Sequence, residues 1–81
     1  MKKISLSEYN PSMGILIDVQ HPEDYKLNPT PNSKNVYADK LLMNHKVLLD
    51  RHNKYYIICN KGVMLVVLQH RIMNYHLLIN I

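Results

Sequence analysis

The 81-residue chain is long enough for one small domain, which we place over residues 1–81. Apolar residues make up 47% of it and charged residues 20%, a balance that argues against disorder. No apolar run approaches the roughly 18 residues of a membrane-spanning helix, and the basic N-terminus is not followed by the apolar stretch of a signal peptide. We therefore expect a soluble, cytoplasmic protein without a membrane partner.

The net charge of +4 is unevenly distributed along the chain. Residues 1–40 are balanced, whereas residues 41–81 carry five Lys and Arg side chains against Asp50 alone. A basic half attracts anions, although a solvated basic surface explains the same pattern equally well. No basic cluster alternates with aromatic residues and no zinc-finger or helix-turn-helix pattern is present, so we expect no nucleic-acid partner.

The N-terminal half begins with a short stretch, residues 3–6, that is typical of an edge strand. The apolar run at residues 14–19 does not alternate with polar residues, which predicts a strand buried on both faces in a parallel sheet. Proline and two acids at residues 21–25 indicate the start of a helix. Residues 26–33 hold two prolines and two asparagines and are expected to form a loop before a very short strand at 35–37.

In the C-terminal half, residues 39–49 carry apolar side chains at a spacing that suits amphipathic helical turns, interrupted near Asn44 and His45. A polar turn at 50–54 then leads into the clearest strand of the chain, residues 55–59, and residues 76–81 are expected to form the last strand.

The segment after residue 59 supports two interpretations. Asn60, Lys61 and Gly62 separate two apolar runs, as the loop of a hairpin would. Alternatively, Gly62 permits a tight loop and a buried helix begins near Val63. The alternation of strands and helices elsewhere favours the helix, because buried parallel strands need crossover helices. The predicted fold class is α/β, a short parallel sheet flanked by helices on both faces.

Several segments together resemble rhodanese-like domains. Leu-Ile-Asp-Val-Gln-His-Pro-Glu-Asp-Tyr at residues 16–25 is similar to the family's (L/I)(I/L)DVR-x-PEEY segment, and residues 31–36 resemble the IPGAxNI stretch. Cys-Asn-Lys-Gly-Val at residues 59–63 resembles the Cys-Arg-Lys-Gly-Val-Thr loop of single-domain thiosulfate sulfurtransferases, and residues 74–80 resemble the GYxVxNL strand. The order of the segments matches over nearly the whole chain, with the family's usual C-terminal helix lacking.

The resemblance implies a sulfurtransferase that needs no cofactor. Cys59 would be the catalytic nucleophile, taking sulfur from thiosulfate or a persulfide donor and passing it to an external thiol or to cyanide. An external acceptor is needed because the chain has no second cysteine. The carboxylate of Asp18 would support the loop that follows Cys59. The loop residues implied in substrate binding are Asn60, Lys61, Gly62, Val63, Met64 and Leu65.

The residues themselves give these positions a physical basis and an alternative. Cys59 ends a predicted parallel strand, where open α/β sheets place their sites, and successive backbone N–H groups after it would form an anion-binding nest. The alternative is a buried structural cysteine. Leu65 replaces the arginine of a Cys-x5-Arg phosphatase loop, and the five histidines lack i, i+4 metal-ligand spacing, so neither a phosphatase nor a metal site is expected.

Departures from the family pattern favour a second functional class. Gln20 stands where the family has Arg, Asn60 replaces the first loop Arg, and Met64 and Leu65 replace polar loop residues. The alternative function is therefore a catalytically weak rhodanese-like module that binds an anion or a protein partner. The apolar residues at 77–81, with no terminal helix to cover them, predict self-association as a homodimer.

Overall fold

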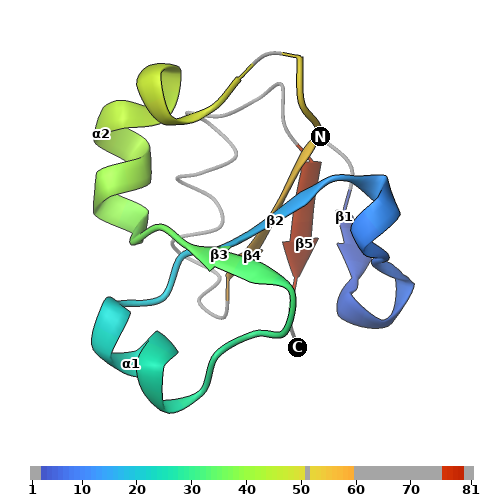
Figure 1. The fold of residues 1–81 in the computed structure, drawn as a ribbon, viewed down its shortest axis with the longest axis horizontal. Helices are drawn as coiled ribbons and strands as arrows, with labels where there is room; N and C mark the ends of the chain where they lie inside the picture. The colour runs from blue at the N-terminus through green and yellow to red at the C-terminus, as the bar shows by residue number, and fades with distance from the viewer. Residues whose placement is uncertain (1–2, 51, 60–75, 80–81) are drawn as a thin grey trace.

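The computed structural model describes residues 3–50, 52–59 and 76–79 (Figure 1). The elements in chain order are β1 (Lys3–Ser5), the 3₁₀ helices η1 (Leu6–Glu8) and η2 (Pro11–Met13), β2 (Ile15–Asp18), α1 (Pro22–Leu27), β3 (Ser33–Asn35), α2 (Ala38–Leu48), β4 (Tyr55–Cys59) and β5 (His76–Ile79). No helix among these described residues is long and apolar enough to cross a membrane.

The strands form one five-stranded sheet in the order β1-β5-β4-β2-β3, and all four neighbouring pairs are parallel. The prediction of a parallel α/β sheet is therefore confirmed. From β2 the chain moves outward to the edge strand β3, and it then continues on the other side of β2 through β4 to β5. The direction in which strands are added thus reverses between β2 and β4.

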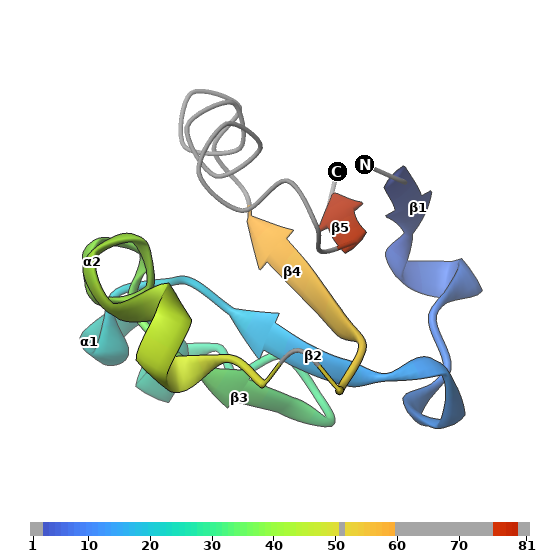
Figure 2. The same cartoon turned by 90° about the horizontal axis from the view of Figure 1, so that it is seen from above.

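Both faces of the sheet are covered by helical segments, which explains why the strands lack polar alternation. Ile17 and Ile57 face α2, where they pack with the fully buried Leu41. On the other face Leu16 and Ile58 pack against side chains of residues 6–13, which hold η1 and η2 and are called the 3₁₀ segment below. Figure 2 shows α2 and this segment on opposite sides of β2 and β4. Each fully buried aliphatic side chain contributes about 1.5–3 kcal/mol, so both layers are needed for a stable domain.

The helices begin and end largely where the pattern indicates. Pro22 is the first residue of α1, and the ring nitrogen Nδ1 of His21 accepts a hydrogen bond from the Glu23 amide at 3.2 Å. In α2 the predicted interruption is confirmed, because Asn44 has the non-helical dihedral angles φ −126° and ψ 18°. Its side-chain amide donates to the Lys40 carbonyl at 3.2 Å, and such side-chain bonds compete with regular helical pairing.

The prediction of a strand at residues 35–37 is wrong by two positions. The strand lies at Ser33–Asn35, so it begins at the last residue of the expected loop and overlaps the predicted strand only at Asn35. Tyr37 instead is the N-cap residue of α2. The Val36 amide donates to the Asp18 carbonyl at 3.0 Å, which ends the pairing of β3 with β2. The hairpin-or-helix alternative at residues 60–68 and the side chains of the last strand lie outside the described residues, although β5 itself lies inside the sheet as expected.

Candidate functional site

The candidate site lies at the carboxyl edge of the sheet, between β2 and β4. β2 ends at Asp18 and β4 ends at Cys59, one residue beyond the point where Asp18 pairs with Ile58. The Val19 amide donates to the Ile58 carbonyl at 3.3 Å and holds the two strand ends together. In open α/β sheets ligands bind outside the carboxyl ends of the strands, at the point where the strand order reverses. The topology brings Cys59 and Asp18 to that point.

The carboxylate of Asp18 is buried, with 2% of the residue exposed. Its Oδ1 accepts a hydrogen bond from the Gln20 backbone amide at 2.9 Å. Its Oδ2 accepts a hydrogen bond from the Gln20 side-chain amide at 2.9 Å and another from the Thr30 hydroxyl. Among the described residues, three neutral donors hydrogen-bond to the Asp18 carboxyl group, as a buried polar group requires.

A second set of hydrogen bonds fixes the backbone beyond Asp18. The side-chain amide of Asn35, at the end of β3, donates to the Asp18 carbonyl at 3.1 Å and to the Gln20 carbonyl at 2.8 Å. The side-chain amide of Gln20 also donates a hydrogen bond to the Asn28 carbonyl at 3.4 Å. The segment from Asn28 to Asn35 therefore holds the carboxyl end of β2 in one conformation.

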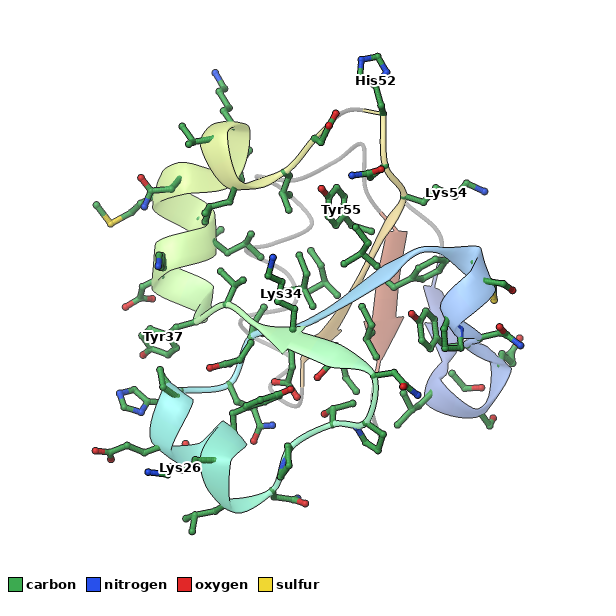
Figure 3. All side chains as sticks on the ribbon, viewed as in Figure 1. Lys26, Lys34, Tyr37, His52, Lys54 and Tyr55 are labelled. Carbon is green, nitrogen blue, oxygen red and sulfur yellow. The ribbon has the colours of Figure 1, made fainter. Side chains whose placement is uncertain are left out.

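Two aromatic rings meet at the same edge of the sheet. His21, which precedes α1, and Tyr37, which precedes α2, pack edge to face with their ring centroids 5.2 Å apart. Figure 3 places Tyr37 at the start of α2, beside the first turn of α1. Because each helix follows a parallel strand, both helices begin at this edge and direct the positive ends of their dipoles toward it.

The described basic residues of the C-terminal half lie at the opposite edge. Lys54 directly precedes β4, and Figure 3 shows it with His52 at the amino end of that strand. Lys46 lies in the last turn of α2, the end of the helix away from the carboxyl edge. From Tyr55 to Cys59 a strand of this length spans about 13 Å, so these charges do not line the candidate site.

The predicted site residues fall into two groups. Asp18 and the strand position of Cys59 are at one edge, as the predicted strands require. The loop residues 60–65, and with them the expected contacts of Asp18 to the loop, lie outside the described residues. Among the described residues, Asp18 accepts hydrogen bonds from Gln20 and Thr30. Among the residues whose placement is described, no group of three or more His, Cys, Asp or Glu side chains could hold a metal ion.

Sequence reasoning missed the parts played by Thr30 and Asn35. Thr30 lies between two prolines in a predicted loop, and no periodic pattern marks a loop hydroxyl as a partner of a strand carboxylate. Asn35 was assigned to a strand, and a strand assignment says nothing of a side-chain amide that donates to the backbone of the neighbouring strand. A signal was present for Gln20 alone, because it differs from the residue in the resembled family.

Comparisons with known proteins identify the fold. No protein-family model matches the chain, and no curated protein matches it. The crystal structure of a rhodanese-related protein from Thermoplasma volcanium superimposes with a TM-score of 0.78 at 20% identity, covering 99% of this chain and 83% of that one. The crystal structure of a protein from Staphylococcus saprophyticus gives a TM-score of 0.71 at 21% identity, covering 100% of this chain and 86% of that one. The chain therefore has the rhodanese-like fold.

Proposed function

We propose that the protein is a sulfurtransferase that moves a sulfane sulfur through a persulfide on Cys59. The observation that carries the proposal is the position of Cys59 as the last residue of β4, at the carboxyl edge where the strand order reverses beside Asp18. The rhodanese-like fold supports the same assignment, since the crystal structure from Thermoplasma volcanium that this chain resembles is called a rhodanese-related protein.

In the proposed reaction the Cys59 thiolate attacks the outer sulfur of a donor such as thiosulfate. A new sulfur–sulfur bond forms, the sulfur–sulfur bond of thiosulfate breaks, and sulfite leaves with the bonding electron pair. Cyanide or an external thiol then removes the outer sulfur and restores the thiolate. The chain holds one cysteine, so this acceptor is a second molecule. No cofactor takes part, and the reducing cytoplasm suits a protein that depends on a free thiol.

The loop residues Asn60 to Leu65 are proposed to bind the sulfur donor, and this part of the proposal rests on the sequence resemblance alone. Lys61 would attract the anionic donor, and the backbone N–H groups of the loop would surround its charge. These contributions matter because the described cations Lys46 and Lys54 lie at the far edge of the sheet.

The alternative function is a rhodanese-like module that binds an anion or a protein partner with little turnover. Two observations favour it. The described basic residues of the C-terminal half lie away from the candidate site (Figure 3). The side chains of Met64 and Leu65 carry no N–H or O–H group that could donate a hydrogen bond to thiosulfate. The two functions differ in one measurable property, which is whether the protein transfers sulfur catalytically through Cys59.

A steady-state assay of thiocyanate formation from thiosulfate and cyanide separates the two functions. The sulfurtransferase predicts thiocyanate formation that saturates with thiosulfate and disappears in Cys59→Ser. Val47→Ser is a suitable control, because Val47 is 86% exposed on α2 and away from the strand ends. Thiocyanate formation at the uncatalysed rate in the folded wild-type protein would leave the binding module as the function.

A further inference from the structure

The 3₁₀ segment is attached to its face of the sheet by a small number of apolar side chains. Its two helices have three residues each, and none of the residues in the segment is fully buried. The side chains that pack against the buried cluster of Leu16, Tyr56 and Ile58 are all half-buried, and they are Leu6, Tyr9 and Met13. Because the stabilisation follows the apolar area covered, each of these side chains carries a large share of the attachment.

Met13 occupies a position at which the backbone is fixed. It is the last residue of η2, and its amide donates to the Asn10 carbonyl at 2.8 Å. The next residue, Gly14, lies so close to Lys54 that an added Cβ would come within 2.7 Å of the Lys54 carbonyl oxygen. The backbone on both sides of the Met13 side chain therefore has little room to shift. A change in the chemistry of this side chain has to be accommodated by rotation of the side chain itself.

A peroxide makes such a change by converting the thioether of methionine to the sulfoxide. The sulfur attacks one oxygen of hydrogen peroxide, a sulfur–oxygen bond forms, the oxygen–oxygen bond breaks and water leaves. The sulfur loses the two electrons that the peroxide gains. The sulfoxide oxygen is a polar acceptor, and its burial on an apolar cluster without a donor is unfavourable. If the side chain of Met13 rotates into water instead, it uncovers Leu16 and Ile58. The contact is lost in either case.

We propose that Met13 is an oxidation site, and that its sulfoxide releases the 3₁₀ segment from the sheet. The side chain is half-buried, so a small oxidant reaches it from solvent, and it packs on the cluster that joins β2 and β4. Met43 has the opposite properties, because it is 83% exposed on α2. Its oxidation leaves a polar group in water and should not disturb the fold. The proposal uses no property of Cys59 and is independent of sulfur transfer.

The test is carried out in a Cys59→Ser background, because a thiolate also reacts with peroxide. After treatment with hydrogen peroxide, peptide mass mapping gives the oxidised fraction of each methionine, and thermal unfolding gives the midpoint temperature. Oxidation of Met13 should lower the midpoint by roughly 5–10 °C. Met13→Leu, which has a similar volume and no sulfur, should be spared this fall. Met43→Leu is the matched control and should show the full fall. If Met13→Leu does not fold, Met13→Ile takes its place.

Hydrogen exchange measures whether the loss of structure is confined to the 3₁₀ segment. The amides of Tyr9 and Met13 donate to carbonyls within the segment, so both should exchange faster once Met13 is oxidised. The Asn28 amide donates to the Asp24 carbonyl at the end of α1 and serves as the internal reference, with an unchanged rate. Methionine sulfoxide reductases specific for each sulfoxide epimer should together restore slow exchange and the original midpoint.

Three results would overturn the proposal. The first is a folded protein in which Met13 stays unmodified after Met43 has been fully converted. The second is a protein with oxidised Met13 whose midpoint temperature and exchange rates are unchanged. The third is an equal fall of the midpoint in Met13→Leu, which would assign the effect to another residue.

Discussion

Gly14 allows β2 to approach the chain that enters β4, and its replacement tests how the two central strands are held. An ideal Cβ at this position would lie 2.7 Å from the Lys54 carbonyl oxygen and 3.0 Å from the Lys54 Cβ. The backbone angles of Gly14, φ 159° and ψ −174°, belong to a region that residues with side chains rarely adopt. Gly14→Ala therefore forces the two backbones apart.

The contact at risk is the hydrogen bond from the Ile15 amide to the Lys54 carbonyl, at 2.9 Å, which begins the alignment of β2 with β4. Loss of one such bond costs about 1 kcal/mol, and forced separation of packed groups costs a further 1–3 kcal/mol. We expect a total loss of about 2–4 kcal/mol. A domain of this length has a stability of roughly 4–12 kcal/mol, so the variant should lose a large part of it.

Thermal and urea unfolding measure this loss directly. The midpoint temperature of Gly14→Ala should fall by roughly 10–30 °C. Tyr9→Phe is the control, because it removes the hydrogen bond from the Tyr9 hydroxyl to the Gly14 carbonyl, at 2.7 Å, without adding a Cβ. It should cost only about 1 kcal/mol. A Gly14→Ala protein within 0.5 kcal/mol of the wild type, on the order of an ordinary surface change, would refute the account of this contact.

Three further predictions concern pH, the loop and assembly. Burial of Tyr9, with a smaller contribution from Tyr56, raises the pKa of the Tyr9 phenol above its ordinary value of about 10. The folded state therefore favours the neutral phenol, and the free energy of unfolding should fall as pH rises above about 10. Urea titrations across that range should show a smaller fall in Tyr9→Phe. Met64→Arg should raise kcat/KM for thiosulfate in the thiocyanate assay by adding charge-assisted hydrogen bonds, and a folded variant without any gain would place that side chain away from the donor. Sedimentation at micromolar concentration should show a dimer that Leu77→Asp disrupts, whereas a stable monomer would contradict self-association through the last strand.

The sheet was predictable because its signals are local and strong. Runs such as Tyr55–Cys59, apolar at consecutive positions, require cover on both faces, and the structure supplies α2 on one face and the 3₁₀ segment on the other. Asn44 likewise interrupts its helix through a side-chain bond within one turn, which the residue type alone suggests.

The contacts that complete the site were not predictable because they join residues far apart in the sequence. The Thr30 hydroxyl meets Asp18, and the Asn35 amide spans two backbone carbonyls, only after β3 has aligned with β2. The strand β3 itself was misplaced, since Ser33 and Lys34 have little β-propensity and are held in the strand by their pairing with Leu16 and Ile17. Tertiary pairing there overrides local preference.

Cys59 ends β4 where the strand order reverses, and the proposed function requires this residue to carry sulfur as a persulfide. One mass measurement tests that requirement most directly. The intact mass of the protein is measured before and after incubation with millimolar thiosulfate, followed by dithiothreitol or cyanide. We predict that thiosulfate adds the mass of one sulfur atom, that either reagent removes it, and that Cys59→Ser never acquires it. Wild-type protein that is folded and stays unmodified would contradict sulfur transfer through Cys59.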